Sequence, residues 1–168
     1  LNSQNIVMKN NQYNYGGKII IEQSDNIEIK DNAHIERIVL KSGISNLNIH
    51  DNGIRSIYSS FWWEDGGHGS GNVIKDNTIY EAIGYNTAFG TGPVTITGNT
   101  FTNQHYGNTG LAINYGSTNY NHWGVGSNTI TGNTFVGGER GITLYGNNNS
   151  EISGNTFQGP NRAIILVG

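Results

Sequence analysis

The chain has 168 residues, enough for one domain, and its 25 glycines and only 12% charged residues are typical of a turn-rich β protein. Its net charge of −3 lacks the basic excess of nucleic-acid-binding surfaces, so nucleic acid is not expected as a partner. Cysteine is absent, which excludes disulfides, and no apolar run reaches membrane-spanning length.

A short alternating run, a turn and an apolar residue recur along the whole chain. The clearest copies are residues 94–101, 129–135 and 151–157, and looser copies lie upstream. A central Asn marks each copy, at positions 11, 32, 52, 77, 99, 133 and 155, so the spacings are 21, 20, 25, 22, 34 and 22. A period of this length is typical of repeat architectures.

The alternation in each copy predicts a short strand with one inward face, and the period leaves no room for a helix in each repeat. We therefore predict that each repeat forms one coil of three short strands, stacked on its neighbours as parallel sheets. The first inward ladder is Met8, Ile29, Ile49, Ile74, Ile96, Ile130 and Ile152. The second is Tyr13, His34, Ile54, Ile79, Phe101, Phe135 and Phe157, with a slip by one residue that turns Ile35 inward in place of His34.

In the third strand of each coil, two positions are expected to face outward, and each forms a row of residues that runs from coil to coil. The first row is Ile20, Val39, Tyr58, Gly84, Ala112, Thr143 and Ile165. The second row is Glu22, Lys41, Ser60, Asn86, Asn114, Tyr145 and Val167. Small and polar residues in the middle of both rows suit a shallow groove for an extended glycan, and an ordinary solvated sheet face is the alternative.

The Asn row is expected at a tight turn, where Asn tolerates the left-handed conformation and its amide can bond to the Asn above and below. Asp31, Asp51 and Asp76 precede this row in three successive coils. We interpret them as a solvated charge ladder; a bound Ca²⁺ is the alternative, since it takes carboxylate oxygens. No other cofactor is expected, because the scattered histidines have no metal-ligand spacing.

Turns of the type Gly-Asn-Thr-Phe, followed by Gly-Ile-Thr-Leu strands, resemble the repeats of right-handed parallel β-helices in the pectate-lyase-like superfamily. The resemblance spans essentially the whole chain and implies an all-β, right-handed parallel β-helix (a solenoid) of about seven coils. It does not specify an activity, because that superfamily includes lyases, hydrolases, epimerases, phage tailspikes and non-catalytic carbohydrate-binding helices. We expect residues 1–168 to form a single domain with uncapped ends, a fragment of a longer solenoid or one covered by neighbouring coils or chains.

Two insertions, 61–71 and 115–124, interrupt the minimal coils and hold every Trp of the chain. Both follow a third strand, so we expect them on the same edge of the solenoid, where insertions commonly form binding surfaces. Aromatic planes there could stack on sugars, with amides bonding the hydroxyls. The expected substrate-binding residues are Trp62, Trp63, Tyr58, Asn86, Asn114, Tyr120 and Trp123. A small structural cluster of the aromatic residues under the loops is the alternative.

Acid–base chemistry is expected from the same insertions. Glu64 and Asp65 are the candidate acid and base, since glycoside hydrolysis requires two carboxyl groups and lyase chemistry requires a base. His68 and His122 are the candidate assisting residues. An acidic turn is the alternative for Glu64 and Asp65. The short Gly-His-Gly match at 67–69 resembles polygalacturonase-type hydrolases, but the companion motifs of that family are absent.

These residues predict a secreted or surface-bound protein, on a cell or a virion, that acts on a polysaccharide or oligosaccharide as a lyase, epimerase or hydrolase. A non-catalytic glycan-binding or tailspike-type helix is the first alternative, and a purely structural spacer is the second. The sequence does not distinguish among these three functions.

Overall fold

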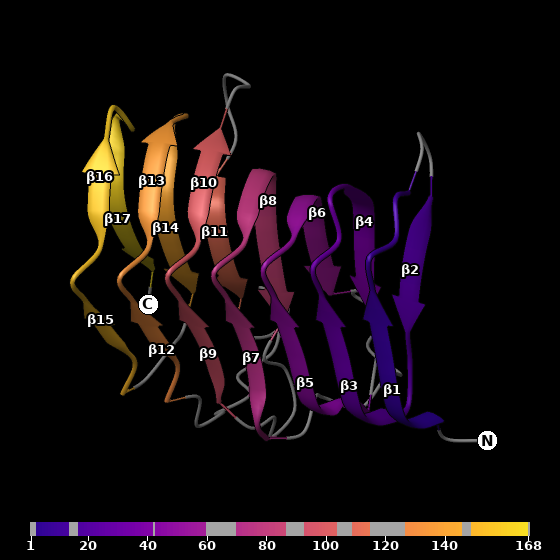
Figure 1. The fold of residues 1–168 in the computed structure, drawn as a ribbon. Coiled ribbons are helices and arrows are strands. Elements are labelled where there is room, and N and C mark those ends of the chain that lie inside the picture. The colour runs from indigo at the N-terminus through magenta and orange to yellow at the C-terminus, as the bar shows by residue number, and fades with distance from the viewer. Residues whose placement is uncertain are drawn as a thin grey trace.

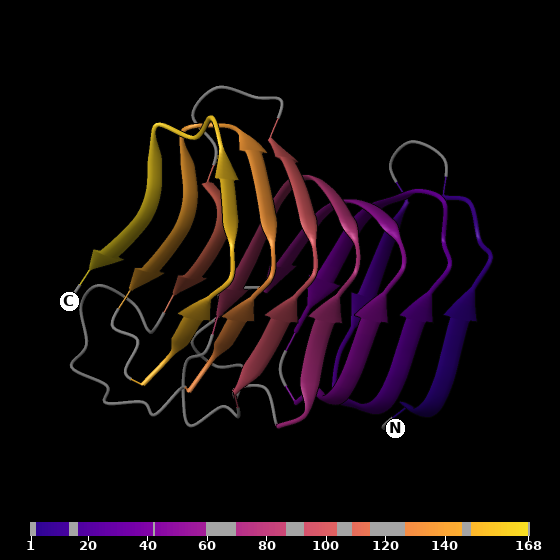
Figure 2. The ribbon, with the colours of Figure 1, turned by 60° about the vertical axis from the view of Figure 1, so that its left-hand side comes forward.

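The computed structural model describes residues 3–13, 17–41, 43–59, 70–86, 93–103, 109–114, 127–145 and 149–167, and these residues form an all-β parallel solenoid (Figure 1). Successive coils stack along one axis from the N-terminal to the C-terminal end, and the turned view shows the ribbons of each sheet side by side (Figure 2). In the part of the chain covered by these ranges, no helix is long and apolar enough to span a membrane.

One face of the solenoid is a parallel sheet that contains the first strand of each repeat. In spatial order its strands are β1 (Ser3–Lys9), β3 (Ser24–Lys30), β5 (Ser45–His50), β7 (Asn72–Lys75), β9 (Val94–Thr97), β12 (Thr129–Thr131) and β15 (Glu151–Ser153). The register pairs each residue of the first predicted ladder with the next, from Met8 with Ile29 to Ile130 with Ile152. The first inward ladder is therefore confirmed.

The remaining strands form a second sheet that branches at β8. Its strands are β2 (Lys18–Ile21), β4 (Ile35–Leu40), β6 (Gly53–Ser59), β8 (Thr78–Asn86), β10 (Thr100–Asn103), β11 (Thr109–Asn114), β13 (Thr134–Gly137), β14 (Arg140–Tyr145), β16 (Thr156–Gln158) and β17 (Arg162–Val167). The start of β8 pairs with β10 and its end pairs with β11. Ile35 pairs with Ile54 and is fully buried, which confirms the slip at His34.

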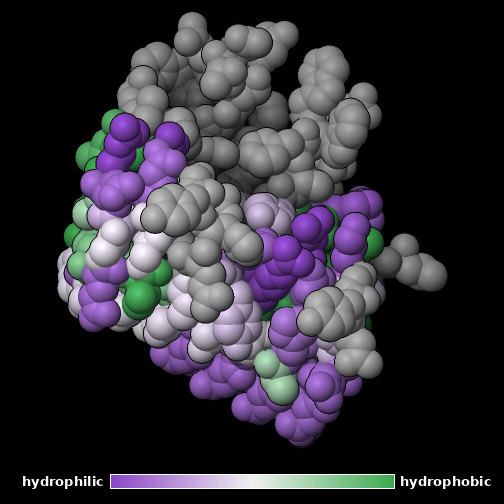
Figure 3. All heavy atoms as spheres, turned by 90° about the horizontal axis from the view of Figure 1, so that it is seen from above, coloured by the Kyte–Doolittle hydropathy of each residue, from purple (hydrophilic) through white to green (hydrophobic). Residues whose placement is uncertain are grey.

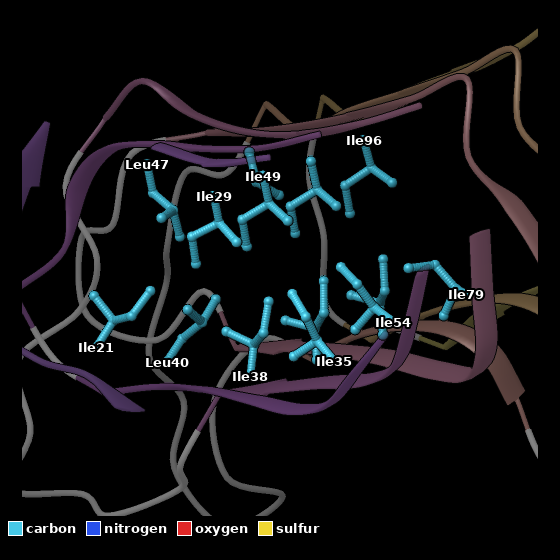
Figure 4. Packing of buried hydrophobic residues seen from close by; sticks show 14 of the residues in the cluster. Ile21, Ile29, Ile35, Ile38, Leu40, Leu47, Ile49, Ile54, Ile79 and Ile96 are labelled. Carbon is cyan, nitrogen blue, oxygen red and sulfur yellow. The ribbon is translucent and has the colours of Figure 1, made fainter. Parts of the chain in front are cut away.

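The core lies between the two sheets and consists mainly of isoleucine. Figure 4 shows Leu47, Ile29, Ile49 and Ile96 of the first sheet facing a row that includes Ile38 of the second. Burial of each such side chain stabilises the fold by roughly 1.5–3 kcal/mol. Because every coil repeats the same inward positions, the core continues from one coil to the next.

The prediction of three short strands in every coil is correct only toward the C-terminus. There Gly137 and Gly138 have φ of 71° and 80° and separate β13 from β14, and Gly159 with φ 93° separates β16 from β17. Upstream, β4, β6 and β8 run without interruption through the second and third predicted strands. Only a glycine adopts these backbone angles without steric cost, so its position decides where the strand breaks.

The residue before each ladder Asn, not the Asn itself, adopts the left-handed conformation. Positive φ occurs at Asn10, Asp31, Asp51, Asp76, Gly98, Gly132 and Gly154. The prediction that placed this conformation on the ladder Asn is therefore wrong by one residue. The left-handed residue bends the chain where it passes from the first sheet to the second (Figure 1), and the ladder Asn that follows is buried from Asn32 to Asn133.

The predicted amide ladder is confirmed and is buried. In Asn77, the side-chain Nδ2 donates to Asn99 Oδ1 at 3.0 Å and to the backbone carbonyls of Ile49 and Lys75. Its own Oδ1 accepts from the backbone N–H and from the Nδ2 of Asn52, both at 3.0 Å. Equivalent contacts join Asn32 to Asn52 and Asn99 to Asn133. Each ladder amide therefore satisfies backbone groups that the turn leaves without a strand partner.

A second set of buried polar residues lies where the first strands begin, and the sequence analysis missed it. Asn72 Oδ1 accepts from the Leu47 backbone N–H at 3.0 Å, and Asn128 Oδ1 accepts from the Val94 N–H at 3.2 Å. Ser150 Oγ accepts from the Asn128 N–H at 3.3 Å. Equivalent positions in this row alternate between apolar and polar residues from coil to coil. Because no single residue type repeats, the row is not recognisable in the sequence.

Replacement of Gly98 by Ala is expected to destabilise the protein by about 1–3 kcal/mol. Gly98 has φ 65°, and an added Cβ would lie 2.3 Å from Asp76 Oδ1. Gly132→Ala is the matched control, because Gly132 has nearly the same φ (63°) but an added Cβ there would lie 3.9 Å from its nearest neighbour. Urea unfolding followed by circular dichroism should show the larger loss for Gly98→Ala, and equal losses would contradict the role of Asp76.

Candidate functional site

Most of the predicted site residues lie outside the described residues. These are the catalytic candidates Glu64, Asp65, His68 and His122 and the binding candidates Trp62, Trp63, Tyr120 and Trp123. Tyr58 is described in full, and the backbone register of β8 and β11 pairs Asn86 with Asn114 as predicted. The candidate site is therefore built from Tyr58 and the outward face of the third-strand segments.

Tyr58 lies on β6, with Val39 of β4 on one side and Gly84 of β8 on the other. Its side chain is 37% exposed. The Arg37 guanidinium lies 5.5 Å from the centroid of the Tyr58 ring, a cation–π arrangement. A Cβ added at Gly84 would lie 3.1 Å from Tyr58 Cδ1, so the absence of a side chain at Gly84 gives the ring its space. These neighbours on both sides restrict the orientation of the ring.

The whole outward row from Ile20 to Ile165 is in register, as predicted, but its exposure is uneven. Ile20 is 59% exposed, whereas the outward Thr143 is fully buried and its Oγ1 has no hydrogen-bond partner. Thr143 therefore does not belong to the exposed part of this row. Ile20 and Tyr58 are exposed, and Val39 between them is partly exposed; we call these three residues the Tyr58 face.

Charged side chains border the Tyr58 face. Lys18 pairs in register with Arg37 along one border. Along the other border, Lys41 Nζ lies 3.2 Å from Glu22 Oε2. The face thus combines an apolar strip and a half-exposed aromatic ring with polar groups on both sides, which is the usual composition of small-molecule and sugar sites.

A second polar cluster lies in the first halves of β4, β6 and β8. Arg55 Nε donates to Glu81 Oε1 at 2.6 Å, and Arg55 Nη1 donates to Glu36. The contact with Glu81, followed by that with Glu36, raises the pKa of Arg55. The register shifts between Ile54 and Ser56, a bulge that brings Glu81 opposite Arg55. This shift of register explains why the sequence analysis missed the cluster.

The three aspartates of the acidic row, Asp31, Asp51 and Asp76, are exposed, which agrees with a solvated charge ladder. Asp51 Oδ2 also lies 2.6 Å from His50 Nδ1. Within the part of the chain that the structure describes, no group of three or more His, Asp or Glu residues is placed to hold a metal ion.

No family model, curated protein or solved structure matches the chain. Viewed from above, the described surface is mostly hydrophilic or of intermediate hydropathy, and hydrophobic residues form small separate groups (Figure 3).

Proposed function

We propose that this chain is a carbohydrate-binding parallel β-helix of the pectate-lyase-like type, right-handed and presented outside the cell or on a virion. An extended glycan would lie on the Tyr58 face. The observation that carries the proposal is the half-exposed Tyr58 ring, held between Arg37 and Gly84 beside the exposed Ile20. The apolar face of a sugar ring packs on an aromatic plane of this kind, and its hydroxyls would bond to the polar groups at the borders.

In the catalytic form of this proposal, Glu64 and Asp65 supply the acid and base, and His68 and His122 assist them. The second candidate function is glycan binding without cleavage. It is favoured by one observation: Glu22, the carboxylate at the border of the Tyr58 face, is already paired with Lys41. The ion pair already occupies one oxygen of this carboxylate, which leaves it less available to a substrate.

Replacement of Tyr58 by Ala is expected to weaken glycan binding about tenfold, the value of one aromatic contact. The measurement is affinity electrophoresis or calorimetry against a panel of neutral and uronic-acid polysaccharides. Tyr80→Ala is the matched control, because Tyr80 is similarly exposed, at 39%, but lies near the start of β8, with its ring centroid 6.3 Å from that of His34. Equal binding by both variants and the unchanged protein would contradict the assignment of the Tyr58 face.

The reaction products distinguish the two forms of the proposal. Unsaturated sugar ends, detected by ultraviolet absorbance, indicate a lyase, and new reducing ends alone indicate a hydrolase. Retention of the glycan without either product indicates binding only. If no polysaccharide is bound or cleaved, the protein is a structural spacer and the proposal fails.

A further inference from the structure

His50 has a carboxylate against each of its two ring nitrogens. Nδ1 lies 2.6 Å from Asp51 Oδ2, and Nε2 lies 3.0 Å from Glu28 Oε1 on the neighbouring strand β3. An ionised carboxylate only accepts hydrogen bonds, and a neutral imidazole has only one N–H to donate. Both contacts can therefore be hydrogen bonds only when the ring carries two protons, as the imidazolium.

We propose that the Glu28–His50–Asp51 cluster is a pH-sensitive clamp, which joins β3 to the turn after β5 while His50 is protonated and releases it when the imidazole loses a proton. The released proton goes to solvent, and one ring nitrogen then presents a lone pair to a carboxylate. That contact becomes repulsive and must open. This inference is independent of the glycan proposal, because the cluster lies on the outward face of the first sheet.

The clamp is connected to the buried amide ladder. Asp51 is the left-handed residue of its turn, with φ 55°, and it directly precedes Asn52. The Asn52 Nδ2 donates to the His50 carbonyl at 2.7 Å and to Asn77 Oδ1 at 3.0 Å. Opening of the contact between His50 and Asp51 therefore loosens the turn that holds a ladder residue in place.

Taken together, the charges around His50 favour the protonated form of its ring. In register, His50 lies between Lys30 of β3 and Lys75 of β7, two like charges that oppose protonation. Lys30 Nζ is directed to Glu28 Oε2 at 2.9 Å. The titratable and charged groups around the ring are Glu28, Lys30 and Asp31 from β3 and its turn, Asp51 from its own turn, and Lys75 and Asp76 from β7 and its turn.

Burial lowers the pKa of His50, but the hydrogen bonds to Asp51 and Glu28 outweigh it and raise the pKa above the ordinary 6.5. The contribution of His50 is therefore fully present below 6.5 and is lost as the pH rises through the raised pKa. The hydrogen bond to His50, followed by that to Lys30, lowers the pKa of Glu28 below its ordinary 4.5. The stabilisation from Glu28 is therefore present above 4.5 and is lost as the pH falls through the lowered value, so the clamp is strongest between these two limits.

The test is a nuclear magnetic resonance titration of the His50 ring in the unchanged chain and in two variants. The midpoint should lie above 6.5 in the unchanged chain and fall in Asp51→Asn, which keeps a side chain that tolerates the left-handed turn. Asp76→Asn removes the equivalent charge one coil away and should move the midpoint less than Asp51→Asn does, because the two ring nitrogens contact Asp51 and Glu28. A midpoint at or below 6.5 in the unchanged chain, or one that Asp51→Asn does not move, would overturn the clamp.

The thermal midpoint of unfolding supplies a second readout. Between 4.5 and 6.5 the unchanged chain should melt about 2–4 °C above the His50→Gln variant, as expected for one charged hydrogen bond in a chain of this size. The difference should disappear at alkaline pH. A difference that is the same at every pH would show that His50 acts only by packing and would sink the proposal.

Discussion

Asn77→Ala is expected to lower the free energy of unfolding by about 3–5 kcal/mol, because it removes five hydrogen bonds from a site that is 2% exposed. The variant leaves the Asn52 backbone N–H and part of its amide without an acceptor, and it leaves the Ile49 carbonyl without its side-chain donor. Each buried group that loses its partner costs about 1–3 kcal/mol. Water cannot easily replace the amide inside a packed coil.

Urea unfolding followed by far-ultraviolet circular dichroism measures this effect. The control is Asn26→Ala, which removes an exposed polar side chain from β3. The Asn26 amide makes only an exposed hydrogen bond to Asp25, at 3.0 Å. Its positive φ of 55° adds a backbone cost of about 1–2 kcal/mol, so the Asn26 loss should remain well below that of Asn77. Equal losses would show that the ladder amides contribute no more than surface amides.

The ladders were predictable because one physical requirement repeats in every coil. Parallel strands that stack in register bring equivalent residues together, so the spacing of Ile49, Ile74 and Ile96 was enough to predict both the sheet and its core. The slip at His34 could also be predicted, since an apolar residue beside it can occupy the inward position at lower cost.

Features that occur once in the chain were not predictable. The bulge that brings Glu81 opposite Arg55 depends on one extra residue in β8. The repeat pattern does not reveal this residue. The continuous strands β4, β6 and β8 were not predicted, because three short strands were expected in every coil, whereas the break between β13 and β14 falls where Gly137 and Gly138 adopt positive φ. In the candidate site, the register of Tyr58 followed from the repeat, but the position of Arg37 over its ring follows from side-chain packing.

The regularity of the ladders also indicates which positions are unsuitable for ligand binding or catalysis. The side chain of an inward Ile or a ladder Asn packs against or hydrogen-bonds to the neighbouring coils. It therefore cannot contact a ligand without loss of stability. Outward positions have no such requirement, and there the residue type varies from coil to coil, as at Tyr58, Gly84 and Thr143. Functional differences between solenoids of this kind are therefore expected in the outward rows and the insertions.

Phe135→Ala is expected to cost about 3–5 kcal/mol of stability, the usual range for loss of a buried aromatic ring. Phe135 is fully buried in the second inward ladder. Its ring stacks on Phe101 with centroids 4.6 Å apart and planes inclined by 9°, and on Phe157 with centroids 5.1 Å apart and planes inclined by 8°. The variant therefore leaves a cavity between two rings that strands on both sides hold apart.

Phe157→Ala is the matched control, because Phe157 is only partly buried and stacks on Phe135 in the same orientation. It should cost about half as much, since part of its surface is already in water. Phe135→Leu should recover most of the loss, because leucine fills much of the cavity. Urea unfolding of the three variants measures these differences. If Phe135→Ala cost no more than Phe157→Ala, the continuous aromatic ladder would not be a major source of stability in these coils.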